Sequence, residues 1–122
     1  MRIEKVEKLY FSTVYSMEEA KSVDELLNRS AKALILLLRL IHLRKAKISR
    51  ELGREITRFL YVEEDKEKKF ERLGALVSLM RDEAVRINYP YVDFYIQNFV
   101  SEMDRIMLTK GYDLFLTPND KA

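Results

Sequence analysis

Apolar residues recur every three or four positions along most of the chain, which is the spacing of one face of an α-helix. The first such stripe runs from Ile3 to Val14 and predicts a helix over this segment, with charged residues on its opposite side. Two Ser-x-x-Glu sequences follow, and each matches a capping box, in which a serine oxygen and a glutamate carboxylate satisfy the first backbone N–H groups. We expect Ser22 to begin the main helix and Ser16 to open a short helical turn in the connection.

A long segment without proline follows, from Val23 to about Val62. Its first half contains the stretch Ala33–Leu38, which is apolar on nearly every side, and Gly53 is the residue that weakens its second half. Two interpretations are open: one continuous helix, or two antiparallel helices with a break near 46–49. Because a helix that is apolar all round must be surrounded, it is either the central element of a bundle or covered by a second copy of the protein.

Two further helices are predicted beyond this segment. The acidic triplet 63–65 places negative charge where the next helix begins, which favours its positive N-terminal end. The stripe after it ends at Pro90, because proline disfavours a helical conformation in the residue before it. The last helix is predicted from about Tyr91 to Thr109, with Gly111 at the position of a left-handed C-terminal cap.

These elements predict an all-α protein, a single small helical bundle of four to five helices with one long central helix. We expect a helical bundle domain over residues 1–111 and a short non-helical C-terminal tail over residues 112–122. Leu114, Phe115 and Leu116 make the tail partly apolar. The tail is therefore expected either to fold back over the end of the bundle or to dock on another subunit as a short peptide.

Composition excludes several classes of protein. None of the 122 residues is a cysteine, which rules out disulfide scaffolds, thiolate metal sites and cysteine nucleophiles. With 48% apolar and 34% charged residues, the chain is too hydrophobic for intrinsic disorder and too charged for a membrane protein. The charged start has no secretory pattern, so we expect a cytoplasmic protein. The high share of Lys, Arg and Glu is typical of thermophiles.

Catalytic chemistry finds little support in the sequence. The single histidine, His42, has no carboxylate close to it along the chain that would orient it as a general base. Glu51 and Glu55 share a helix face, as two ligands of a hard metal would, but the arginines around them favour ordinary ion pairs. The three glycines lie too far apart to form a phosphate-binding loop. We therefore predict a protein that is not an enzyme and that has no cofactor, metal or small-molecule substrate.

Charge is concentrated in one part of the chain. Between Arg29 and Arg58 there are nine basic residues and two acidic ones, although the whole chain carries a net charge of only +2. On a continuous helix the last basic residues of this region fall within an arc of about 80°. Such a face can contact a phosphate backbone without reading its sequence, bind an acidic protein partner, or be solvated or paired with the acidic run 63–71. The candidate residues are Arg44, Lys47, Arg50, Arg54 and Arg58.

Aromatic residues are the second group of candidate functional residues, and the chain has seven tyrosines and six phenylalanines. Those within 91–99 cannot all face one side of a helix, because successive residues diverge by about 100°. Some are therefore expected at a contact surface, where tyrosine supplies apolar area at low entropic cost. The candidate interface residues are Leu36, Leu40, Leu43, Tyr91, Tyr95 and Phe115.

The leading hypothesis is a non-catalytic α-helical interaction protein that acts by self-association, as a homodimer or higher oligomer, or as a small subunit of a larger assembly. It rests on an excess of apolar and aromatic faces over what one small bundle can cover. The alternative is a nucleic-acid-binding accessory subunit that contacts the phosphate backbone of DNA or RNA non-specifically through the basic helix face. No membrane partner is expected.

Overall fold

The computed structural model describes residues 2–115, and side chains through Thr109. Five α-helices and one short 3₁₀ turn account for most of these residues, and no strand occurs among them. The predicted small all-α bundle is confirmed. The elements are α1 (Ile3–Ser16), η1 (Met17–Glu19), α2 (Val23–Leu43), α3 (Arg50–Tyr61), α4 (Lys66–Arg86) and α5 (Val92–Phe115).

The two serines predicted to cap helices behave differently. The Ser22 side chain accepts a hydrogen bond from the backbone N–H of Glu25 and begins α2, as predicted. Ser16 precedes the short turn η1, which confirms a helical turn in the connection. Its hydroxyl, however, does not cap this turn but donates a 2.6 Å hydrogen bond back to the carbonyl oxygen of Thr13 in α1. The capping role expected of Ser16 is therefore wrong.

The segment 23–62 is not one continuous helix. It forms the separate helices α2 and α3, so the interpretation with a break is confirmed and the continuous one is wrong. Lys45, with a left-handed φ of 55°, ends α2. Its N–H donates to the carbonyl oxygen of His42, and the N–H of Ala46 donates to that of Ile41, both at 3.0 Å. This pair of bonds is a Schellman motif, in which glycine usually occupies the left-handed position.

Ser49 begins α3 and connects it to α4. Its side chain accepts a 3.1 Å hydrogen bond from the backbone N–H of Leu52, which satisfies one of the unpaired donors at the helix start. Its own N–H donates to the carboxylate of Glu83 in α4, at 2.9 Å. The start of α3 is thus fixed against the last turns of α4.

The last two helices differ from prediction only at the end of the chain. Asp65, in the acidic triplet expected at this helix start, accepts a hydrogen bond from the N–H of Lys68 and caps α4. The last helix does not end near Thr109 with Gly111 as its cap, as predicted, but continues to Phe115. The predicted end of this helix is therefore wrong. The rest of the predicted tail, 116–122, lies outside the described residues, as do the side chains of Leu114 and Phe115.

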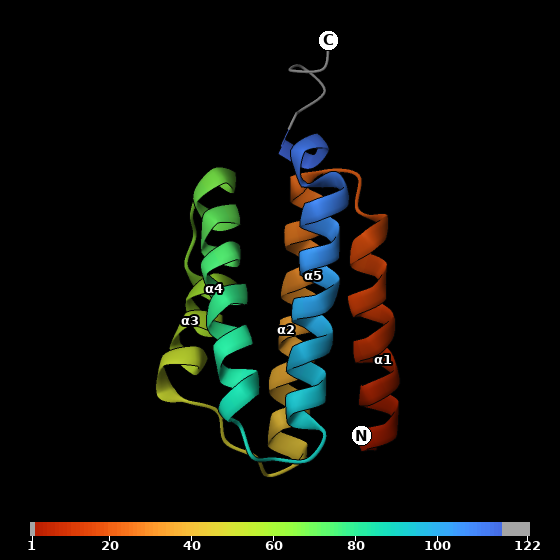
Figure 1. Ribbon diagram of the computed structural model, residues 1–122, viewed down its shortest axis with the longest axis vertical. Coiled ribbons are helices and arrows are strands. Elements are labelled where there is room, and N and C mark those ends of the chain that lie inside the picture. The colour runs from red at the N-terminus through yellow and green to blue at the C-terminus, as the bar shows by residue number, and fades with distance from the viewer. Residues whose placement is uncertain (1, 116–122) are drawn as a thin grey trace.

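The helices run alternately up and down, with α2 at the centre (Figure 1). α2 contacts each of the other four α-helices, whereas α1 and α3 do not contact each other within the described part of the chain. The central position explains why this helix is apolar on so many sides. Since α1 and α3 do not meet, no described helix covers the side of α2 between them.

The core is one cluster of buried side chains, to which α2 contributes several leucines. The side chains of Leu34, Leu37 and Leu40 are completely buried. They belong to the same cluster as Tyr10 of α1 and Phe59 of α3. Most of the apolar surface that the sequence presents on α2 is therefore covered within one chain.

Candidate functional site

The five basic residues predicted to share one helix face do not form a single surface. Arg44 follows the last residue of α2, and Lys47 lies in the connection between α2 and α3. The other three lie on α3. Among these five residues, only Arg44 is deeply engaged with other helices.

Arg44 is held in a network that joins three helices. Its guanidinium lies 3.0 Å from the carboxylate of Glu7 in α1 and donates a 3.2 Å hydrogen bond to the hydroxyl of Tyr95 in α5. That hydroxyl in turn donates to Glu7, and the guanidinium lies 4.0 Å from the centre of the Tyr91 ring. Burial opposes the charge on Arg44, but the hydrogen bonds to Tyr95 and Glu7 outweigh it and raise the pKa of the guanidinium. The group therefore stabilises the bundle rather than offering a free cation.

The other four candidate basic residues interact less with the rest of the bundle. Arg58 is paired with Glu55 of the same helix, at 3.4 Å. Lys47, Arg50 and Arg54 are exposed and have no ion pair with any described residue. They are the part of the predicted basic face that is open to a partner.

The acidic run 63–71 forms no ion pair with the candidate arginines Arg50, Arg54 or Arg58 among the described residues. Glu64 instead accepts hydrogen bonds from Arg72 of α4, which hold the pKa of the Glu64 carboxyl below its ordinary value. Among the described residues, the ion pairs of the five candidate residues are therefore those of Arg44 with Glu7 and of Arg58 with Glu55.

The predicted interface residues are also divided by the fold. Leu40 and Tyr95 are completely buried, so they belong to the core of one chain and are not accessible to a second. Leu36 and Leu43 are partly buried against the core. Tyr91 is 56% exposed and is the accessible member of the set. Phe115 is the last residue of α5, and its side chain lies outside the described part.

A groove lies on the side of α2 that α1 and α3 leave open. It has a volume of about 590 Å³ and combines apolar and basic side chains. Ile35 is 50% exposed and Tyr61, at the end of α3, is 73% exposed. We call this site the α2–α3 groove; it is lined by Ile35, Leu38, Arg39, His42, Leu43 and Tyr61.

The sequence analysis did not identify Tyr61, and it did not single out Ile35 within the apolar segment of α2. Ile35 stands in a helix that is apolar all round, so no periodic signal distinguishes its exposed side from its buried sides. Tyr61 carries a weak signal, since it lies opposite the core stripe of Leu52, Ile56 and Phe59 on α3. That these two residues meet at one groove follows from the turn between the helices.

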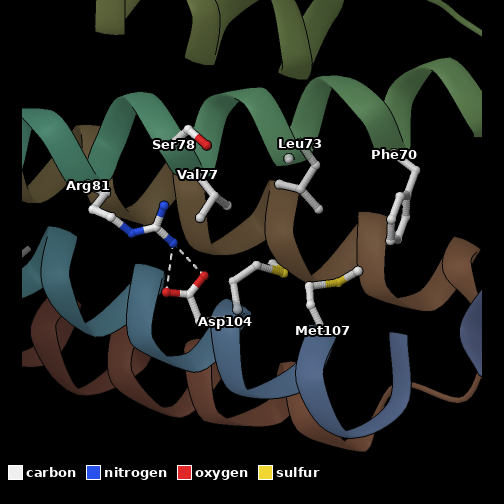
Figure 2. Close-up of a pocket in the computed structure, with 9 residues that line it drawn as sticks. Phe70, Leu73, Val77, Ser78, Arg81, Asp104 and Met107 are labelled. Carbon is white, nitrogen blue, oxygen red and sulfur yellow. Dashed lines mark hydrogen bonds and ion pairs between the residues drawn. The ribbon is translucent and has the colours of Figure 1, made fainter. Parts of the chain in front are cut away.

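A second, smaller pocket lies between α4 and α5 (Figure 2). It has a volume of about 140 Å³, and Phe70, Leu73 and Val77 of α4 face Met107 of α5 across it. At one end the guanidinium of Arg81 contacts both carboxylate oxygens of Asp104, at 2.5 and 2.7 Å. The charged groups near the pocket are thus paired with each other, Ser78 is the other polar residue among the described lining, and the remaining lining is mostly apolar.

The residues considered for catalysis and metal binding are not brought together. His42 lies on the exposed side of α2, at the groove, and Glu55 is paired with Arg58 and Arg72. In the part of the chain that the structure describes, no three His, Asp or Glu residues are grouped so that they could hold a metal ion.

Comparison with known proteins adds no relative: no family model, curated protein or solved structure matches the chain. Over the described range, no helix combines the length and the apolar character needed to cross a membrane.

Proposed function

We propose that this chain is a non-catalytic interaction protein, which works by associating with a second protein chain through the α2–α3 groove. The observation that carries the proposal is the exposure of Ile35 in the middle of the central helix. A half-exposed isoleucine beside a largely exposed tyrosine is the kind of apolar patch that marks contact surfaces. The second chain is another copy of the protein or a subunit of a larger assembly.

The groove has the composition of an interface rather than of a reaction centre. Its polar members are Arg39 and His42, and no carboxylate among the described residues lines it to activate the imidazole as a general base. It is wide open to solvent, whereas substrate sites usually enclose most of their ligand. These features favour binding of a protein surface.

The test is the molecular mass in solution and the capture of partners. Light scattering over a range of concentrations measures self-association, and affinity purification from the native organism, with nuclease added to half of the sample, identifies protein partners that nucleic acid does not bridge. We expect Ile35→Asp to abolish the association. Val85→Asp, on the exposed side of α4, is the matched control and should leave it unchanged. A wild-type protein that is strictly monomeric and retains the same proteins as Ile35→Asp would contradict the proposal.

A second candidate function is non-specific contact with nucleic acid. It is favoured by the three exposed cations without an ion pair in the described structure, Lys47, Arg50 and Arg54. Each phosphate contact would release counterions, so affinity for an oligonucleotide should fall steeply as salt rises. Arg50→Glu with Arg54→Glu should abolish a gel shift seen at low salt, whereas the charge-matched changes Lys5→Glu and Lys8→Glu on α1 should weaken it little. Absence of any shift at low salt contradicts this candidate.

A further inference from the structure

We propose that the α2–α3 groove binds an acidic amphipathic helix supplied by a different protein. The inference rests on the proposed function and adds to it the chemistry of the partner. Three properties of the groove carry it: its apolar length, the exposed cations at or near it that have no ion pair with a described residue, and the clash of charge that a second copy would bring.

The apolar part of the groove has the length that a short helix needs. Ile35 and Leu43 lie eight residues apart on α2, which corresponds to about 12 Å or just over two helical turns. Leu38 lies between them, and Tyr61 contributes from α3. A partner helix with apolar residues at positions i, i+4 and i+7 would place them along this distance, as helices that bind in grooves commonly do.

One cation lines the groove, and two more share a helix face with its residues. Arg39 is a lining residue. Lys32 lies seven residues before it on α2, and Arg54 lies seven residues before Tyr61 on α3, which places each on the same face of its helix. All three cations are exposed and none has an ion pair with a described residue. Within the part of the chain that the structure describes, no carboxylate lines the groove. A helix with an apolar stripe and acidic flanks would therefore match the groove in both respects.

The same charges disfavour a second copy of the chain. A symmetric homodimer through this groove would place Arg39 of each copy near the cations of the other, because such an interface uses the same surface twice. Like charges facing each other across an interface oppose association. A nucleic acid would satisfy the cations but leave Ile35 and Tyr61 against a phosphate backbone with no apolar contact. An acidic amphipathic helix would pair with the cations and also cover the apolar side chains of Ile35 and Tyr61.

The test is selection of binding peptides by the folded protein. A display library of 16-residue helix-forming peptides, with apolar residues at helical spacing and random charge elsewhere, is selected on the wild-type chain. We expect the enriched peptides to be acidic. A synthetic copy of one should bind at least about tenfold more weakly to Ile35→Asp and to Arg39→Glu, and more weakly at high salt. Val85→Asp should bind it as the wild type does, and circular dichroism should show all three variants folded.

Enrichment of neutral or basic peptides, no enrichment, or equal binding to the wild type and Ile35→Asp would overturn the inference. These outcomes are distinguishable from failure of the proposed function. A chain that forms a homodimer broken by Ile35→Asp, yet selects no acidic helix, keeps its interaction role and loses only this partner. A chain that neither associates nor selects any peptide loses both.

Discussion

The hydroxyl of Tyr10 donates a 2.7 Å hydrogen bond to the backbone carbonyl oxygen of Tyr95, a residue 85 positions further along the chain. Both side chains are completely buried, and their rings meet edge to face with centroids 5.8 Å apart. The bond joins α1 to α5. It continues into the network of Glu7 and Arg44, so the first, second and last α-helices are connected at one level of the bundle.

Tyr10→Phe should lower the free energy of unfolding by about 1 kcal/mol, because it removes this one hydrogen bond and keeps the ring in place. Urea denaturation measures the effect. Tyr15→Phe is the matched control: Tyr15 is exposed on the same helix, and its change should have almost no effect. Equal stabilities for the two variants would show that the buried bond contributes nothing.

Alkaline pH should destabilise the protein through the same two tyrosines. Burial raises the pKa of Tyr10 well above its ordinary value of 10.0, and burial together with the hydrogen bond to Glu7 raises the pKa of Tyr95 to about 12. The unfolded chain loses these protons near pH 10 whereas the folded chain keeps them. Stability is therefore full below pH 10 and falls as the pH rises from 10 towards 12, by about 3 kcal/mol for Tyr95 alone.

Unfolding measurements at several pH values, combined with tyrosine absorbance, test this expectation. In the folded protein Tyr10 and Tyr95 should keep their protons at pH 10 and contribute tyrosinate absorbance only as the protein unfolds. Ionisation of these two buried tyrosines near pH 10, with no loss of stability, would contradict the expectation.

The sequence predicts the helices well because their signals are local. The stripe from Ile3 to Val14 and the Ser22 cap depend only on residues a few positions apart, and both appear in the structure. The prediction that Gly111 caps the end of the last helix was wrong, because a glycine is also tolerated inside a helix. α5 continues through this position. The break after α2 could not be chosen from the sequence, since the left-handed position belongs to Lys45 and not to glycine.

The candidate site was only partly predictable because it depends on that break. A helical projection places Arg44 beside Arg50 and Arg54, but the turn separates them, and Arg44 binds Glu7 instead. The exposure of Ile35 depends on where α1 and α3 lie against α2, which is tertiary information.

Lys45→Gly should stabilise the protein by about 0.5 kcal/mol. Lys45 has a φ of 55°, a conformation that costs a residue with a side chain about 1 kcal/mol and that glycine adopts freely. The greater entropy of glycine in the unfolded chain offsets part of this gain. Thermal denaturation of Lys45→Gly and Lys45→Ala separates the backbone effect from loss of the lysine charge, since alanine keeps the strain. A melting temperature for Lys45→Gly no higher than that of Lys45→Ala would be evidence against strain at this position.

Replacing Arg44 should lower the free energy of unfolding more than replacing Arg54. Arg44→Met leaves Glu7 without its ion pair and removes the contact with the Tyr91 ring, so we expect a loss of about 2 kcal/mol in the free energy of unfolding. Arg54→Met removes an exposed cation and should change stability by less than about 0.5 kcal/mol. Urea denaturation of both variants measures the difference. Equal losses would mean that the network around Arg44 does not stabilise the bundle.

Leu40 and Ile35 test directly which side of α2 is open. Both lie in the same helix, and replacing either with alanine removes a branched aliphatic side chain. Leu40 is completely buried whereas Ile35 is 50% exposed, so Leu40→Ala leaves a cavity and Ile35→Ala mainly removes surface. We expect the free energy of unfolding to fall by about 3 kcal/mol for Leu40→Ala and by less than about 1 kcal/mol for Ile35→Ala. If denaturation of the monomeric protein gave equal losses, Ile35 would be buried, and the apolar surface on which the interaction proposal depends would not exist.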